Sequence, residues 1–428
     1  MKMKHFSLIA GAAFAALVFA GCPDRRENTL VVWVFTDEIG QKIEMHGIAE
    51  TLGMGIDVSL TPSDQFQGRL DPALRAGRRV APDVFTLESA FVRRYIESGL
   101  LLDLTELYEE VSGRVLPYPV EIATYGGRVY GMSWQATPGA MFFRRSLALE
   151  YLGTDDPAEV QEFFADWELF METALSMNEA SGGRVAVISA VGDLNHPFRS
   201  ARSQPWIVDG QLYIDPAMID YMRMARFLRY NSLDGRVDQW STGWFDGMRG
   251  TLTDGAGNPV PVFAYFLPTW GIHYTLRNNA PLTHGDWGMI PGPVTWFWGG
   301  TWLAAYAETR HPEAAKEFIR QVATNEANIY RWARETGDFL NNVYVMNRIL
   351  ADDSPAPSDS PVAFLGGQNH FEIFMAMAPY VDGSKIQGTD QAIDSLFLEA
   401  VTQYVNGEAA MEQALAMFRE QVRAQLGF

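Results

Sequence analysis

The chain has 428 residues, of which 47% are hydrophobic and 20% charged, which is typical of a globular protein too long for one hydrophobic core. Its formal net charge of −19 disfavours nucleic acid and anionic membrane surfaces as binding partners. Cys22 is the only cysteine, which excludes internal disulfide bonds and cysteine-based metal sites. We expect two domains that are stabilised by packing.

The N-terminal segment has the pattern of an export signal. An apolar run over 6–20 follows two lysines and is too short to span a membrane at about 20 residues per helix. The run closes on Cys22 in a motif that resembles a bacterial lipobox, with Phe19 in place of the usual Leu. We expect a signal peptide over 1–21, lipid attachment at Cys22 and a polar tether over 22–29. An ordinary signal peptide without lipid attachment is the alternative.

The segment after the tether alternates between two patterns. Short apolar runs indicate buried strands, and apolar residues at helical spacing indicate helices between them. The strands are expected over 30–35, 56–60 and 83–87, and the helices over 39–52, from Ser63 or Asp64 to about Leu74, and up to about Ser98. This order is typical of a parallel sheet with helices on both faces.

The middle and last parts of the chain continue with mixed elements. We expect extended segments over 129–134, 141–144, 185–189, 260–266 and 302–306, and helices over 157–180, over 216–231 and from Pro312. The last third is mostly helical, with one apolar face over 393–404 and another over 411–426. These faces are expected to pack against the core.

Several chemical signatures are absent from the sequence. The seven histidines form no HExxH pair, and there is no GxxxxGK[ST], GxGxxG or GxSxG motif. These absences disfavour a zinc site, a nucleotide cofactor and a serine nucleophile, so we expect no metal and no cofactor. An enzyme that works with two carboxylates would leave no such motif, and that alternative stays open.

Tryptophan is concentrated in one region, since eight of the 12 tryptophans lie between 206 and 302, many beside Pro or Gly. An indole offers a flat apolar face that suits the C–H face of a sugar ring, while carboxylates and amides bond to the hydroxyls. The candidate rings from this region are Trp206, Trp240, Trp244, Trp270 and Trp298, and the candidate polar partners at strand ends or crossover loops are Asp37, Glu88, Gln135 and Asn341. Each could instead be a core ring, a helix cap or a partner of loop backbone.

Three ordered stretches resemble one family. They are APDVF at 81–85 with ESGLLLDL at 97–104, GRVYGM at 127–132 with FFR at 142–144, and GGTWLA at 299–304 with HPEAAKEFI at 311–319. Together they resemble the maltose-binding-like group of extracytoplasmic solute-binding proteins of carbohydrate ABC importers, over nearly the whole mature chain.

The resemblance implies a two-lobed α/β fold of the type II periplasmic-binding-protein kind, with parallel-rich sheets, crossover strands and the ligand between the lobes. By position, lobe I is expected over 30–136 plus 299–338, and lobe II over 139–290 plus 342–428. The resemblance places Asp37 and Glu88 after the first and third strands, Trp134 and Gln135 at the first crossover, Trp270 in a stacking element, and Trp298 before the second crossover. Asn341-Asn342 and Gly383-Ser384-Lys385 depart from the family pattern and leave the sugar and its size open.

The sequence therefore predicts a monomeric binding protein outside the cytoplasm, in contact with the membrane only through lipid on Cys22. It would capture a neutral mono- or oligosaccharide and deliver it to the permease subunits of an ABC importer, without catalysis. A polyol or glycerophosphodiester is an alternative ligand that needs a basic cluster, for example from Arg199, Arg202 or Arg277. An exported glycoside-cleaving enzyme and a structural or adhesive surface lipoprotein are alternatives of other classes.

Overall fold

The structure is a computed structural model that describes residues 28–352 and 354–428. The predicted signal peptide over 1–21, the predicted lipid attachment at Cys22 and most of the tether over 22–29 lie outside the described residues. Among the residues that are described, none of the helices combines the length and the apolar character needed to span a bilayer.

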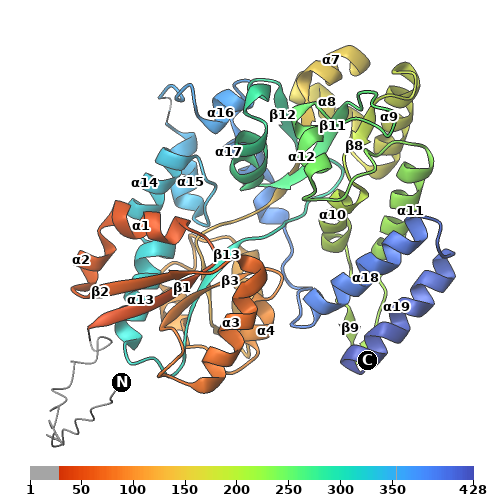
Figure 1. The fold of residues 1–428 in the computed structure, drawn as a ribbon. Coiled ribbons are helices and arrows are strands. Elements are labelled where there is room, and N and C mark those ends of the chain that lie inside the picture. Colours follow the sequence, from red (N-terminus) through yellow and green to blue (C-terminus); the bar gives the residue numbers. More distant parts are fainter. Residues whose placement is uncertain (1–27, 353) are drawn as a thin grey trace, which may run out of the picture.

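Lobe I is built on a five-stranded sheet with the order β2-β1-β3-β13-β6 (Figure 1). Strands β1, β2 and β3 run parallel, whereas β13 returns from late in the chain and lies antiparallel to β3. The apolar run of β1 is buried because helices cover the sheet. The strands are β1 (Thr29–Val34), β2 (Gly55–Leu60), β3 (Val84–Glu88), β6 (Met132–Ser133) and β13 (Thr301–Ala305), and the helices are α1 (Glu38–His46), α2 (Ile48–Leu52), α3 (Ser63–Ala76), α4 (Val92–Ile96), α5 (Thr105–Glu109), α6 (Pro117–Ala123) and α13 (Pro312–Ile319).

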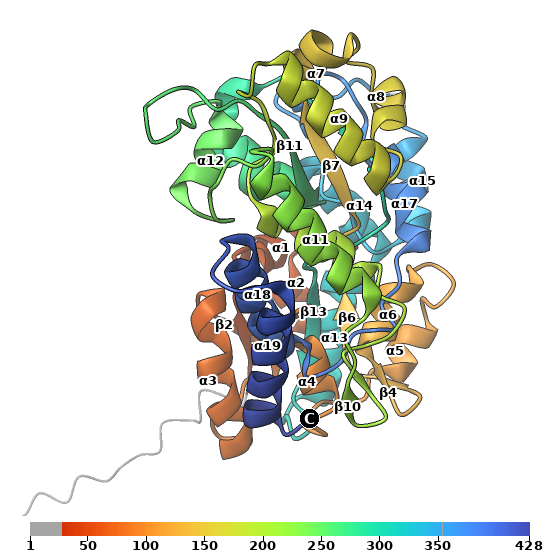
Figure 2. The same ribbon diagram turned by 90° about the vertical axis from the view of Figure 1, so that its right-hand side faces the viewer.

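Lobe II is built on a four-stranded sheet with the order β12-β7-β11-β8. Its strands are β7 (Gly139–Arg144), β8 (Ala186–Ile188), β11 (Val262–Pro268) and β12 (Trp287–Ile290), and its helices include α7 (Arg145–Leu152), α8 (Pro157–Phe163), α9 (Trp167–Ala180), α10 (Asn195–Ser200), α11 (Pro216–Tyr230) and α12 (Thr242–Arg249). The C-terminal helices α18 (Asp390–Val405) and α19 (Met411–Leu426) form a hairpin that packs against α11 (Figure 2).

The other helices and strands lie between or after these elements in the chain. They are β4 (Thr124–Tyr125), β5 (Arg128–Val129), η1 (Val191–Leu194), β9 (Ile207–Val208), β10 (Gln211–Leu212), η2 (Ile272–Arg277), η3 (Pro281–Thr283), η4 (Arg320–Thr324), α14 (Glu326–Thr336), α15 (Val343–Leu350), α16 (Pro361–Phe364), α17 (His370–Met377) and η5 (Ala378–Tyr380). Of these, η2 and η4 are π-helical turns.

The chain crosses between the lobes in segments that lie side by side. Gln135 pairs with Leu340, and Pro138 pairs with Phe297, in isolated antiparallel bridges. Asn341 N–H donates to the Trp134 carbonyl oxygen at 2.7 Å, within the same pairing. The crossovers therefore form a narrow ribbon between two larger sheets, which is the geometry of a hinge.

The core consists of two clusters of apolar side chains. They lie on opposite faces of the lobe II sheet, because successive side chains of a strand point to opposite faces. In β7, Phe142 belongs to one cluster, whereas Met141 and Phe143 belong to the other. The first cluster runs from the sheet of lobe I to one face of the sheet of lobe II, and the second fills the opposite face under α9, α11, α18 and α19.

Two predicted helices are each broken in the structure. The helix expected over 39–52 becomes α1 and α2, because Gly47 adopts a left-handed conformation with φ 61°. The helix expected over 157–180 becomes α8 and α9, since both Asp156 and Asp166 act as N-caps whose carboxylates accept backbone N–H bonds. A second capping residue inside a periodic pattern was the signal of that break.

Candidate functional site

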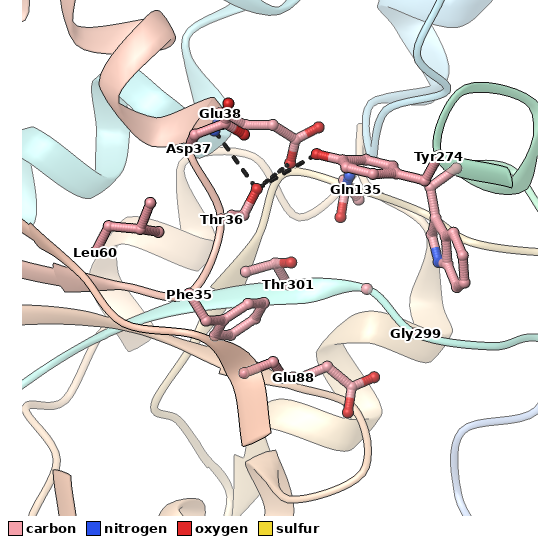
Figure 3. Close-up of a pocket in the computed structure, with 13 residues that line it drawn as sticks. Phe35, Thr36, Asp37, Glu38, Leu60, Glu88, Gln135, Tyr274, Gly299 and Thr301 are labelled. Carbon is pink, nitrogen blue, oxygen red and sulfur yellow. Dashed lines mark hydrogen bonds between the residues drawn. The ribbon is translucent and has the colours of Figure 1, made fainter. Parts of the chain in front are cut away.

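A cavity of about 520 Å³, here called the cleft cavity, opens between the lobes beside the crossovers. Its walls come from the loop after β1, the ends of β2 and β3, both crossovers and the segment that follows β11 (Figure 3). The lining residues are Phe35, Thr36, Asp37, Glu38, Leu60, Ser63, Glu88, Gln135, Trp270, Tyr274, Gly299, Gly300 and Thr301.

The position of the cleft cavity follows from the topology of lobe I. Because β1, β2 and β3 are parallel, their carboxyl ends meet at one edge of the sheet, where open α/β sheets bind ligands. Asp37 follows β1 and Glu88 ends β3, so both carboxylates reach the same cavity from distant parts of the sequence.

The carboxylate of Glu88 is held by neutral donors. Ser89 Oγ donates to its Oε1 and the Ala90 backbone N–H donates to its Oε2, each at 2.7 Å. Burial raises the pKa of Glu88, and these hydrogen bonds together with the charge of Arg199 in α10 oppose that shift. The side chain is therefore a fixed acceptor for a ligand hydroxyl or ammonium group.

Glu38 belongs to a chain of contacts that crosses the cleft. Thr36 Oγ1 donates to Glu38 Oε2 at 3.3 Å, and the Tyr274 hydroxyl lies 3.5 Å from Thr36 Oγ1 (Figure 3). Burial, helped by the charge of Asp338, raises the pKa of Glu38 to about 7, while Lys42 opposes the shift. Tyr274 from η2 thus bridges from lobe II to lobe I across the cavity mouth.

A buried lysine, Lys42 of α1, lies near Glu38 and outside the cavity lining. Lys42 is only 2% exposed, and its Nζ lies 3.6 Å from the ring centroid of Trp332 and 5.7 Å from that of Trp134. Burial lowers the pKa of Lys42 to about 7, against the opposing charges of Asp338 and Glu38. Cation–π contact offsets part of the cost of burying this ammonium group.

Trp240, Trp270 and Trp298 form an aromatic cluster on the lobe II side of the cavity, and of these three rings Trp270 lines the cavity. Trp240 stacks on Trp270 with ring centroids 6.0 Å apart and an interplanar angle of 15°, and Trp298 meets Trp270 edge-on at 4.9 Å. Trp270 Nε1–H donates to the Trp298 carbonyl oxygen at 3.2 Å. Gly299 permits this contact, since a Cβ there would lie 2.6 Å from Trp270 Nε1. The cluster therefore holds the Trp270 indole in one orientation at the cavity.

The sequence places the chain in a known family. Residues 48–343 match the model of the bacterial extracellular solute-binding protein family. The chain belongs to this family. Membership implies a location outside the cytoplasm and a solute-binding role. No curated protein matches the sequence.

Solved structures similar to this solute-binding protein confirm the predicted two-lobed α/β fold. An extracellular solute-binding protein of family 1 superposes with a TM-score of 0.76 at 18% identity, covering 91% of this chain and 98% of that one. An ABC transporter-associated binding protein from B. animalis subsp. lactis, in complex with β-1,6-galactobiose, gives 0.70 at 20% identity over 92% and 96%. The galacto-N-biose/lacto-N-biose I-binding protein from Bifidobacterium longum, in complex with lacto-N-biose, gives 0.69 at 16% identity over 93% and 97%.

Four of the ten candidate ligand-binding residues line the cleft cavity of this solute-binding protein, namely Asp37, Glu88, Gln135 and Trp270. Trp240 and Trp298 lie behind Trp270 and support it, and the Trp240 side chain is 48% exposed at the surface. That any of these residues contacts ligand stays a prediction.

The structure corrects the placement of the other four candidates, which are buried away from the cavity lining. Trp206 Nε1–H donates to Asp394 at 2.7 Å, and Trp244 Nε1–H donates to Asp193 at 3.0 Å, inside lobe II. Trp134 is fully buried, so its ring has no face free for a sugar. Asn341 is 2% exposed and bonds to the backbone of Leu116 and Ser133, which fixes a crossover.

The basic cluster required by the phosphodiester alternative does not reach the cleft cavity. Arg199 pairs with Asp394 at 2.6 Å, and Arg202 pairs with Asp390 at 3.1 Å. Arg277 bonds to the Asp359 carbonyl oxygen, away from the lining. In the described ranges, no set of three His, Cys, Asp or Glu side chains is placed to hold a metal ion.

Sequence reasoning missed Glu38, Thr36 and Tyr274. Glu38 and Lys42 are one helical turn apart, a spacing that signals neighbouring side chains on α1. Tyr274 stands four residues after Trp270, at the same helical spacing. Nothing in the sequence indicates that Tyr274 meets Thr36, because the two are 238 residues apart and belong to different lobes.

Proposed function

We propose that this solute-binding protein captures a carbohydrate in the cleft cavity and delivers it to the permease of an ABC importer, without enzymatic activity. The observation that carries the proposal is the pairing of an aromatic face with polar acceptors in one cavity: Trp270 and Tyr274 from lobe II lie across from Asp37 and Glu88 of lobe I. A sugar ring matches this arrangement because it has an apolar face and a rim of hydroxyls. The complexes of similar structures with β-1,6-galactobiose and lacto-N-biose support the same ligand class.

Capture would use the crossovers as a hinge. The ligand first meets one lobe, and rotation about 135–139, 291–299 and 338–342 then brings the other lobe onto it. Contacts that form only after closure shift the population toward the closed state by their differential affinity. One stacked ring at about 1–3 kcal/mol, with several hydrogen bonds at about 1 kcal/mol each, is consistent with a micromolar Kd, which corresponds to about −8 kcal/mol.

The proposal includes the domain division and the anchor. We assign lobe I to 30–136 plus 299–338 and lobe II to 139–290 plus 342–428, with a lipid on Cys22 holding a monomer at the membrane next to its permease. A single acyl chain binds membranes only marginally, so the anchor needs more than one chain.

A thermal-shift screen of the purified mature protein against mono- and disaccharides tests the carbohydrate assignment. A ligand that binds only the native state stabilises it by mass action and so raises Tm. At a free-ligand concentration of 100 times Kd, the stabilisation is about 2.7 kcal/mol. We expect at least one sugar to raise Tm in a concentration-dependent way. A panel in which every sugar leaves Tm unchanged, while a non-carbohydrate solute raises it, would refute the proposal.

A further inference from the structure

The cleft cavity carries an unbalanced charge. Three carboxylates line it, those of Asp37, Glu38 and Glu88. Within residues 28–352 and 354–428, no Lys, Arg or His side chain belongs to its lining. Two of these carboxylates come from the loop and helix after β1 and the third from the end of β3, so negative charge is present at both ends of the lobe I wall (Figure 3).

The charge of Glu88 is not balanced by the arginines across the cleft. Arg199 acts on Glu88 electrostatically, but it forms an ion pair with Asp394 at 2.6 Å. The neighbouring Arg202 is paired with Asp390 at 3.1 Å. Two arginines and two aspartates therefore balance one another, and the hydrogen bonds to Glu88 come from a neutral hydroxyl and a backbone N–H.

Glu38 also lies among more negative than positive charges. Lys42 contributes one positive charge from behind, whereas Asp37 and Asp338 contribute two further negative ones. Tyr274 and Thr36, which face Glu38 from the mouth of the cavity, are neutral. Asp338 does not line the cavity, but it is 4% exposed and its Oδ1 has no hydrogen-bond partner, so a buried carboxyl group with an incomplete set of donors acts on Glu38 from behind the lining.

Removing carboxylates from water costs free energy unless a cation or enough donors replace the water. When a neutral sugar fills the cavity it displaces water, and its hydroxyls offset only part of this cost. An ammonium group offsets more, because its positive charge attracts the carboxylates in addition to donating hydrogen bonds to them, whereas a neutral hydroxyl only donates. The faces of Trp270 and Tyr274 would attract a cation as well.

From this charge distribution we propose that the preferred ligand is an amino sugar, a carbohydrate that carries a protonated primary amine next to its hydroxyls. This inference rests on the proposed function, and it replaces the neutral sugar predicted from the sequence with a cationic sugar. Trp270 stacks against the ring, while the ammonium group is bound by Glu88 or by the pair of Asp37 and Glu38.

The same geometry links binding to protons. Burial holds the pKa of Glu38 near 7, so a fraction of the free protein carries a proton on this carboxyl at neutral pH. A bound ammonium group favours the ionised carboxylate, and the protein would then release that proton to the buffer. Below about pH 7 the protonated carboxyl of Glu38 attracts the cation less, and Lys42, whose pKa burial also lowers to about 7, gains positive charge over the same range, so affinity for the amine falls more than affinity for a neutral sugar.

Calorimetric titration with matched sugars tests the inference. Glucosamine, galactosamine and the β-1,4-linked disaccharide of glucosamine are each compared with the N-acetylated and the hydroxyl counterpart, at pH 7.0 and low salt. We expect one amine to bind at least about tenfold tighter than both of its counterparts. We also expect this preference to shrink at pH 5.5 and in high salt.

Two variants and a control identify the source of the preference. Glu88→Gln and Glu38→Gln should each reduce the preference for the amine while the neutral counterpart still binds. Glu412→Gln, at an exposed carboxylate on α19, should change neither. Circular dichroism verifies that each variant is folded. If one of the two glutamate variants does not fold, the other still tests the source of the preference.

The outcomes separate the inference from the proposed function. Neutral counterparts that bind as tightly as the amine, or tighter, overturn the amino-sugar assignment and leave carbohydrate capture in place. An amine preference that survives both glutamate variants overturns the assignment of its source to this cavity. No binding by any sugar of this panel overturns the amino-sugar inference, whereas the carbohydrate assignment is decided separately by the wider thermal-shift screen.

Discussion

Trp270→Ala tests whether the aromatic wall contributes the binding energy that the cavity geometry suggests. The indole of Trp270 lines the cleft cavity. Its ring centroid lies 6.0 Å from that of Trp240 and 4.9 Å from that of Trp298, and its Nε1–H donates to the Trp298 carbonyl oxygen, so the ring is fixed. Because the ring is already oriented, the Trp270 side chain loses little conformational entropy when a ligand stacks on it. Losing a stacked face costs about 1–3 kcal/mol, which corresponds to a Kd about 5- to 150-fold higher.

The assay is calorimetric titration with whichever sugar gives the largest thermal shift. We expect Kd to rise by about 5- to 150-fold in Trp270→Ala while the variant still unfolds cooperatively. Tyr230→Ala is the matched control, because Tyr230 on α11 is an aromatic residue that is 77% exposed outside the cleft lining. An unchanged Kd in folded Trp270→Ala would remove this ring from the binding site and with it the main support for sugar stacking.

Three further outcomes are expected. Saturating sugar should lower the radius of gyration in solution scattering, since the crossovers act as a hinge; an identical profile contradicts lobe closure. Gly299→Ala should weaken sugar binding, because the new Cβ would lie 2.6 Å from Trp270 Nε1, whereas Gly285→Ala has a similar positive φ but open space around its Cβ and should leave affinity unchanged. Cys22→Ser should move the protein from the membrane fraction to the soluble fraction, and retention in the membrane contradicts the lipid anchor.

Sequence alone predicted the part of the site that depends on topology. Asp37 and Glu88 reach one cavity because each follows a strand of the same parallel sheet, and parallel strands bring their carboxyl ends to one edge. Strand order and strand ends are encoded locally, in short apolar runs and the residues after them. These local signals are sufficient to position the lobe I wall.

The tryptophans show where such reasoning stops. Trp206, Trp244 and Trp270 all occur near turn residues or capping residues, but only Trp270 lines the cavity. The burial of the other two depends on Asp394 and Asp193, whose carboxylates accept from the indole N–H groups after long-range folding. A sequence window cannot distinguish an indole that meets a distant carboxylate in the core from one that faces a cleft.

The larger apolar cluster has a consequence for how the molecule melts. It includes Val32 and Phe85 from lobe I together with Tyr265 and Trp287 from lobe II, so neither half encloses its own interior completely. If one lobe unfolds, apolar surface on the other lobe becomes exposed to water. The two lobes should therefore unfold together, in a single calorimetric transition. A hinge and thermal cooperativity can therefore coexist in this chain, because the halves pivot at a ribbon yet depend on a common interior.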